Sequence, residues 1–170
     1  PLQQLSQINN WESAALYITS EISGPLGRPV SMLTFAIQKN AWPDSLQHFL
    51  LFNILLHLCN GALVFFLCRL CLQAMRQDGQ QSTVPQQTFA LFFITSIWLL
   101  SPMQISTSLI TVQRMTGLSA FFVLAGLLLY VHGLLYAANQ RNLGRLLQIT
   151  GLGLCTLVAA FSKENGILLP

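Results

Sequence analysis

The sequence predicts an all-α membrane protein, a polytopic bundle of about four transmembrane helices with an amphipathic helix at the membrane surface. Hydrophobic residues make up 53% of the 170 residues and charged residues only 8%, whereas ordinary soluble domains carry roughly 25% charged residues. Four apolar segments also follow one another along the chain. The net charge of +3 comes from few groups. The chain has no basic stripe with interleaved aromatic residues, so nothing in the sequence indicates nucleic-acid binding.

The four apolar segments cover residues 46–72, 88–100, 113–138 and 146–161. The first, about 27 residues or about 40 Å as a helix, is long enough for a hydrocarbon core of roughly 30 Å. The fourth needs flanking residues to complete a crossing. The second covers only about 20 Å. It spans if it extends over 86–105 with a bend near Pro102, and the alternative is a re-entrant segment.

We expect one membrane domain over residues 1–170, with an extracytoplasmic segment (1–45) before the transmembrane helices (46–170). If all four segments cross, residues 1–45, 101–113 and the "SKENG" motif share one side of the membrane. Lys and Arg are equally frequent on the two sides, so the positive-inside rule does not set the orientation. We place the short arginine-bearing loops in the cytoplasm. Because the chain opens on Pro1 and closes on the apolar run "GILLP", we expect a fragment of a longer protein.

The surface helix is predicted over residues 29–39, where Pro29 suits the first helical turn. Its apolar face carries Leu33, Ala36 and Ile37, and its other face carries Ser31, Thr34 and Gln38. At about a dozen residues the helix is too short to span, which is typical of an amphipathic helix lying along the membrane.

Two arginines stand next to predicted helices. Arg28 precedes the surface helix, whose N-terminus attracts anions. An arginine there binds a phosphate or acidic group bidentately, or it contacts lipid headgroups. Arg114 opens a span, where an unpaired charge is costly. It shares a predicted helical face with Thr107 and Thr111, whereas Gln113 points elsewhere. Arg114 either faces a cavity for an anionic headgroup or bonds to carbonyls at the interface.

The "SKENG" motif places Lys163 and Glu164 side by side between two apolar runs. Neighbours on a helix point about 100° apart and pair poorly with each other. Each is therefore available to another element, and Arg28 and Arg114 are candidate partners for Glu164. The alternative is a polar hairpin in which Asn165 and Gly166 form the turn.

Polar residues also occur inside the first span, where Asn53, His57 and Asn60 form one stripe. We expect interhelical hydrogen bonds, with Gly61 allowing close approach. A metal ligand or proton relay at His57 is the alternative. The sequence indicates no required cofactor. A divalent metal ion stays compatible with the sequence, but no motif supports one.

Four stretches together carry a family resemblance: "GPLGRPVSMLTFAIQ", "FNILLHLCNGALVFFLCRL", "ISTSLITVQRMTGLSAFFVLAGLLLYVHG" and "FSKENGILLP". From about residue 24 onward the chain resembles multi-span bacterial membrane proteins that often carry a tetratricopeptide-repeat tail. It is similar to the membrane part of the transmembrane and tetratricopeptide-repeat (TMTC) O-mannosyltransferases, relatives of protein O-mannosyltransferases with the glycosyltransferase C fold. The resemblance implies a bacterial inner-membrane protein whose motif loops face the periplasm.

The resemblance also implies a reaction, the transfer of a sugar from a polyprenyl-phosphate carrier to an acceptor protein or glycan outside the cytoplasm. Carried over by position, Arg28, Arg114 and Lys163 are candidates for binding the lipid phosphate. Gln113, Glu164 and Asn165 are supporting candidates. In such enzymes the catalytic acid follows a membrane span, and no predicted span precedes the first loop of this sequence. We therefore expect the catalytic acid before residue 1. We also expect the fragment to be inactive alone. Glu12 and Glu21 are weaker substitutes within the chain.

Two other functions compete with the glycosyltransferase. A transporter or flippase-like module is motivated by polar residues at membrane depth, such as Asn53 and His57. It predicts a broken helix lining a midplane cavity. A non-catalytic membrane scaffold is the other, and its polar motifs are then plain loops.

Overall fold

The computed structural model describes residues 2–19, 28–75, 84–137 and 140–169, and these are almost entirely helical, with no strand among them. The predicted all-α class is therefore confirmed. The elements in chain order are η1 (Leu2–Gln7), α1 (Trp11–Thr19), α2 (Pro29–Ile37), η3 (Lys39–Ala41), α3 (Leu46–Met75), α4 (Val84–Leu99), α5 (Pro102–Leu109), η4 (Thr111–Gln113), α6 (Arg114–Ala137), α7 (Arg141–Ile149), η5 (Thr150–Leu154), α8 (Cys155–Ser162) and η6 (Glu164–Leu168).

Three helical stretches are long and apolar enough to cross a membrane: Leu46–Met75, Thr111–Ala137 and Arg141–Ser162. The last combines α7, α8 and the π-helical segment η5 between them, so flanking residues complete the fourth predicted segment. These three helices are compatible with an integral membrane protein.

The second predicted segment is bent, as expected near Pro102. Gln87–Leu99 and Pro102–Leu109 meet at 55°, and together they form either a broken fourth span or a re-entrant loop. The prediction that Thr107, Thr111 and Arg114 share one helical face is wrong, because α5 ends at Leu109 and Ile110 is extended. The run Ile110-Thr111-Val112 is β-branched throughout, and such side chains are restricted in a helix.

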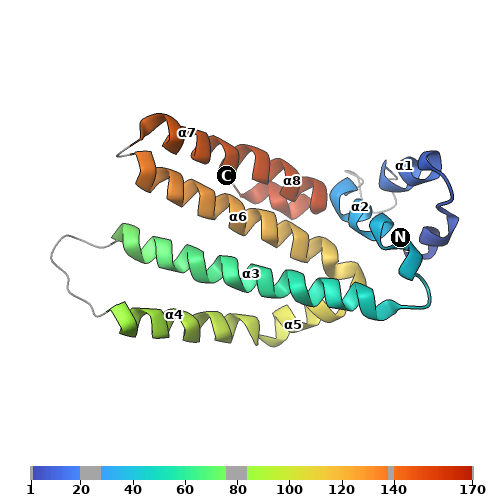
Figure 1. The fold of residues 1–170 in the computed structure, drawn as a ribbon, viewed down its shortest axis with the longest axis horizontal. Helices are drawn as coiled ribbons and strands as arrows, with labels where there is room; N and C mark the ends of the chain where they lie inside the picture. The colour runs from blue at the N-terminus through green and yellow to red at the C-terminus, as the bar shows by residue number, and fades with distance from the viewer. Residues whose placement is uncertain (1, 20–27, 76–83, 138–139, 170) are drawn as a thin grey trace.

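The long helices stand side by side in the order α4, α3, α6 and α7–α8 (Figure 1). Glycines let α6 touch the last stretch backbone to backbone. A Cβ added to Gly126 would lie 2.7 Å from the Gly151 carbonyl oxygen, and one added to Gly133 would lie 2.7 Å from that of Gly144. Small residues of this kind let membrane helices pack closely. Close packing matters there because helices in lipid gain no hydrophobic free energy by associating with one another.

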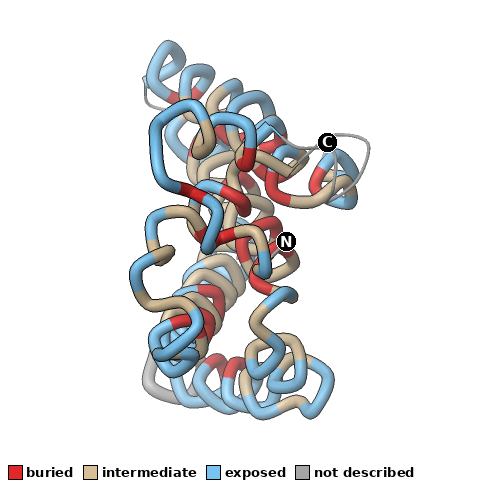
Figure 2. Tube along the Cα trace, turned by 90° about the vertical axis from the view of Figure 1, so that its right-hand side faces the viewer, coloured by how far each residue is buried: buried red, intermediate tan, exposed pale blue. Residues whose placement is uncertain are grey.

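The N-terminal elements η1, α1 and α2 cover one end of this bundle (Figure 1). A cluster of buried side chains joins them to α3 and α6: Leu5, Ile8, Tyr17, Met32, Phe35, Phe49 and Met115. Figure 2 colours these buried positions red, while the outer turns of the helices are largely exposed. The apolar core of the described residues therefore sits at one end of the bundle.

Helix α2 packs through a different face from the one the sequence suggests. Its buried residues are Ser31, Met32 and Phe35, while Leu33 and Ile37 of the expected apolar face are 47% and 73% exposed. Ser31 is tolerated inside because its hydroxyl donates a hydrogen bond to the Ser162 carbonyl oxygen at 2.9 Å. The apolar face of α2 is consequently left outside the bundle.

The chain reverses after α8, as the hairpin interpretation of "SKENG" requires. Lys163 is extended, and η6 then runs back along α8. A Cβ on Gly166 would lie 2.3 Å from the backbone of Ala159, so only glycine fits this approach. The reversal brings the polar motif to the end of the bundle that the N-terminal elements cover.

The backbone contact between α6 and η5 predicts a difference between two neighbouring glycines. A Cβ at Gly151 would meet the Gly126 carbonyl oxygen at 2.6 Å, whereas a Cβ at Gly153 meets nothing within 4 Å. We expect Gly151→Ala to lower the free energy of unfolding by about 1–3 kcal/mol, because a backbone must shift. Gly153→Ala should leave it unchanged or raise it, since alanine favours helix. SDS titration in mixed micelles measures both, and equal values would contradict the close packing.

Candidate functional site

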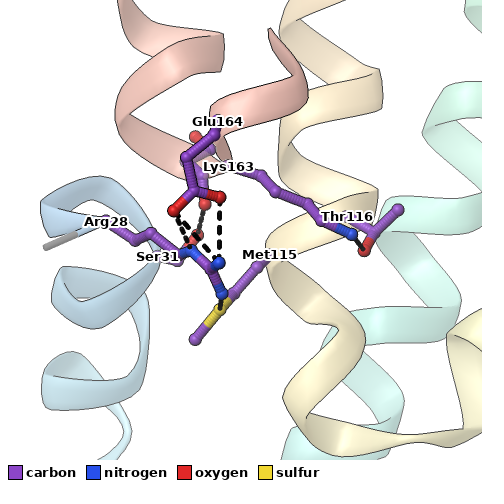
Figure 3. Close-up of polar contacts among 7 residues, drawn as sticks. Arg28, Ser31, Met115, Thr116, Lys163 and Glu164 are labelled. Carbon is purple, nitrogen blue, oxygen red and sulfur yellow. Dashed lines mark hydrogen bonds and ion pairs between the residues drawn. The ribbon is translucent and has the colours of Figure 1, made fainter. Parts of the chain in front are cut away.

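Arg28 and Glu164, which are 136 residues apart in the chain, form an ion pair at the capped end of the bundle (Figure 3). Arg28 Nη2 donates to Glu164 Oε2 at 2.9 Å and to Oε1 at 3.1 Å, and Arg28 Nε donates to Oε1 at 3.2 Å. The structure therefore confirms one of the two partners expected for Glu164. The side chains keep 24% and 33% of their surface exposed, so the pair stays accessible.

The backbone of Arg28 has an unusual conformation for this residue type. Its φ of 48° and ψ of 51° lie in the left-handed region, which costs a non-glycine residue roughly 1–2 kcal/mol. A right-handed helical conformation is disfavoured at this position because Pro29 follows. Arg28 is the N-cap of α2, and its carbonyl oxygen accepts the first helical hydrogen bond, from Met32 N at 3.1 Å. Its Nη1 also donates to Met115 Sδ at 3.4 Å.

Lys163 turns away from Glu164, as the adjacency of the two residues predicts. Its ammonium donates to Thr116 Oγ1 at 2.8 Å, on the first turn of α6 (Figure 3). Each member of the "SKENG" pair thus has a partner on another element. Lys163, Glu164 and Arg28 form what we call the motif cluster, which joins α2, α6 and the turn after α8.

The charge of Glu164 is set by its arginine partner. The Arg28 side-chain hydrogen bonds, together with a backbone hydrogen bond, hold the pKa of Glu164 below its ordinary value of 4.5. Glu164 is therefore ionised near neutral pH. The motif cluster carries two cationic groups and one anionic group, which leaves a net positive charge at this end of the bundle.

Arg114 lies in the same end of the bundle, but it is 1% exposed. Its Nε donates to Asn53 Oδ1 at 3.0 Å, and its two terminal nitrogens donate to the carbonyl oxygens of Phe49 and Thr34 at 3.1 and 3.3 Å. The guanidinium carbon lies 4.4–5.3 Å from the ring centres of Phe35, Phe49 and Phe52. Arg114 therefore links α2, α3 and α6 from inside, and it does not contact Glu164.

Tyr17 of α1 is buried near this arginine. Burial raises the pKa of Tyr17 to about 12, although the charge of Arg114 acts in the opposite direction. The phenol is therefore neutral at any physiological pH. Its placement ties α1 to the same buried end of the bundle, which the sequence did not predict.

The polar stripe of α3 makes the interhelical hydrogen bonds that the sequence predicts. Asn53 and Asn60 donate to the carbonyl oxygens of Ile110 and Gly117 at 3.4 and 3.0 Å. His57 Nε2 lies 3.0 Å from the Leu99 carbonyl oxygen. A Cβ on Gly61 would lie 2.6 Å from the Leu99 side chain, so this glycine does allow a close approach.

The remaining candidate residues lie outside the motif cluster. Gln113 is half-buried and lines a small cavity of about 40 Å³ together with Arg114 and Thr116. Asn165 is exposed, and Glu12 is exposed in the first turn of α1. Glu21 lies outside the described residues. Within the ranges that the structure covers, no three His, Cys, Asp or Glu side chains gather in a way that could hold a metal ion.

Besides Tyr17, three further residues at this end of the bundle were not predicted from the sequence. Ser31, Met115 and Thr116 contact the motif residues or their immediate neighbours. A weak signal existed for the last two, since both directly follow Arg114. Ser31 offered none, because a serine facing the predicted polar side of an amphipathic helix is ordinarily exposed.

Comparison of the chain with known protein families, with characterised proteins and with solved structures finds no match. The geometry of the site itself therefore has to support any functional conclusion.

The enclosure of Arg114 predicts a large effect on stability. We expect Arg114→Met to lower the free energy of unfolding by about 3 kcal/mol, because Asn53 Oδ1 and two buried carbonyl oxygens lose a charged donor. Arg114→Lys should also destabilise, since one ammonium cannot reach three separated acceptors. Arg141, which is exposed, provides the control. Arg141→Met should change stability by less than about 0.5 kcal/mol, and an equal effect at both sites would contradict the linking role of Arg114.

The ion pair predicts a pH-dependent stability difference between the wild type and Glu164→Gln. Because the folded pKa of Glu164 is lowered, its stabilisation is complete above pH 4.5 and is lost as the pH falls through the folded pKa. The difference should stay below about 1 kcal/mol, since both side chains are partly exposed. Unfolding of both proteins at a series of pH values tests this. A difference that grows on acidification would contradict it.

Proposed function

We propose that the chain is part of a membrane glycosyltransferase that transfers a sugar from a polyprenyl-phosphate carrier to a protein or glycan acceptor outside the cytoplasm. In this proposal the motif cluster binds the phosphate of the carrier. The observation that carries it is the convergence of Arg28, Lys163 and Glu164, from two distant parts of the chain, on one partly exposed site at the end of the apolar helices.

The chemistry of the reaction motivates the assignment. A phosphate-linked carrier leaves as an anion, and fixed cationic donors stabilise the charge that develops on the leaving group. The guanidinium of Arg28 binds two oxygens of the Glu164 carboxylate, and an arginine fork of this kind also matches the geometry of a phosphate. Lys163 adds a mobile ammonium from the adjacent residue. The end of a membrane-compatible bundle is where the phosphate of a membrane-bound carrier would lie.

Glu164 plays a defined role in this proposal. Its carboxylate occupies the Arg28 fork, so a phosphate must displace it or share the guanidinium with it. On displacement Glu164 becomes available to an acceptor hydroxyl, for which a nearby carboxylate is a suitable base.

Arg114 is proposed as a positioning residue. The family resemblance makes Arg114 a candidate for binding the phosphate, and that role stays a prediction. Its enclosure by Phe35, Phe49 and Phe52 instead supports a role in fixing the start of α6, which carries the partners of Arg28 and Lys163.

The proposal predicts that Arg28→Ala and Lys163→Ala weaken binding of polyprenyl phosphate. Each substitution removes a charged donor, and we expect about 10-fold weaker binding for each. Arg28→Lys should restore only part of the affinity, because an ammonium cannot bind bidentately. Binding to the purified protein in nanodiscs measures the effect, and Arg141→Ala is the matched control. Unchanged affinity in both variants would overturn the phosphate assignment.

A non-catalytic membrane scaffold is a second candidate, and one observation favours it. Arg28, Lys163 and Arg114 all have partners within the protein, as expected if they only hold helices together. The binding experiment separates the two functions. A scaffold shows no polyprenyl-phosphate binding, and its Arg28 and Lys163 variants lose stability instead.

A further inference from the structure

The face of α2 that lies outside the bundle forms one wall of a groove. Together with α1 and residues 8–10, which precede α1, it borders a volume of about 610 Å³, which is within the roughly 300–1,000 Å³ of small-molecule sites. The walls carry the apolar side chains of Ile8, Ala14, Ile18, Leu33, Ala36 and Ile37. This groove shares no residue with the motif cluster.

The groove is polar at one end and apolar along its length. Lys39 follows α2, and its ammonium donates to the Ile8 carbonyl oxygen at 3.2 Å, so the end of α2 lies beside the start of α1. Asn9 and Asn10 line the same end. Ile18 and Leu33 line the groove towards the other ends of the two helices. A cationic and amide-bearing end that leads into an apolar channel matches an amphiphile with an anionic head.

The position of the groove points to the bilayer as the source of that amphiphile. Helix α2 packs against α8 and α6, which belong to two of the membrane-compatible stretches. The helix that forms one wall of the groove therefore lies against the end of the apolar helices. Trp11 lines it and is 91% exposed, and tryptophan is enriched where membrane proteins meet the headgroup layer.

We propose that this groove binds one hydrocarbon chain of an anionic membrane phospholipid, whose phosphate is bound by Lys39. The inference goes beyond the proposed function, because it concerns a resident lipid and a different face of α2. The apolar residues Leu33, Ala36 and Ile37 are then covered by lipid. This explains how the exposed face of α2 is stable outside the bundle.

Fluorescence quenching of Trp11 by phospholipids with brominated acyl chains tests the proposal on the protein in vesicles. The Trp11 signal is the difference between the wild type and Trp11→Phe. Brominated phosphatidylglycerol should quench it at an about five-fold lower mole fraction than brominated phosphatidylcholine, given the attraction of one lysine for an anionic headgroup. Lys39→Gln should abolish this preference, whereas Lys39→Arg should keep it.

Filling the groove provides the second arm. Ala36→Phe should reduce quenching by both lipids, whereas Leu16→Phe should not, because Leu16 is 71% exposed on α1 and does not line the groove. Equal quenching by the two lipids in the wild type, equal effects of the two phenylalanine substitutions, or no quenching would each overturn the proposal. Lys39→Gln should leave polyprenyl-phosphate binding at Arg28 unchanged, so failure of one proposal is distinguishable from failure of the other.

Discussion

The end of the bundle that η1, α1 and α2 cover depends on the hydrogen bonds of the Arg114 guanidinium. Helices in lipid gain no hydrophobic free energy by associating with one another, so packing and polar contacts must hold them together. Arg114 reaches three elements at once, through Thr34 on α2, Phe49 and Asn53 on α3, and its own place on α6. Arg114 is 1% exposed, and burial strengthens each of these hydrogen bonds and makes an unsatisfied charge there costly. The positions of α2 and α6 are consequently fixed relative to each other.

The two arginines at this end serve different physical purposes because their surroundings differ. Arg114 is enclosed and bonded to neutral acceptors, which suits a structural link. Arg28 lies at the surface of the same assembly, held in a left-handed backbone conformation and paired with a carboxylate that remains partly exposed. A strained and accessible cation beside a second cation, Lys163, has the features expected of a binding site. The link inside therefore positions the Arg28–Glu164 ion pair outside.

The sequence predicted the long apolar helices because their composition favours a membrane bundle, and it predicted the bend near Pro102 from the chemistry of proline. The adjacency of Lys163 and Glu164 predicted that each turns to another element, which the contacts with Thr116 and Arg28 confirm. The buried face of α2 was not predictable, because the burial of Ser31 depends on a carbonyl oxygen 131 residues away. The choice of Arg28 over Arg114 as the partner of Glu164 likewise depended on which arginine the phenylalanine rings enclose.

The unexpected face of α2 connects the fold to both proposals. Because Ser31, Met32 and Phe35 are directed into the bundle, the N-terminus of α2 places Arg28 against the turn after α8, where Glu164 lies. The same rotation directs Leu33 and Ile37 away from the bundle, into the groove beside α1. Had the apolar face packed inward, as its periodicity suggests, the groove would be filled and Ser31 would not reach the Ser162 carbonyl oxygen. One short helix therefore separates a charged site on the bundle side from an apolar groove on the other, and both lie at the end of the apolar helices where phosphate headgroups are expected.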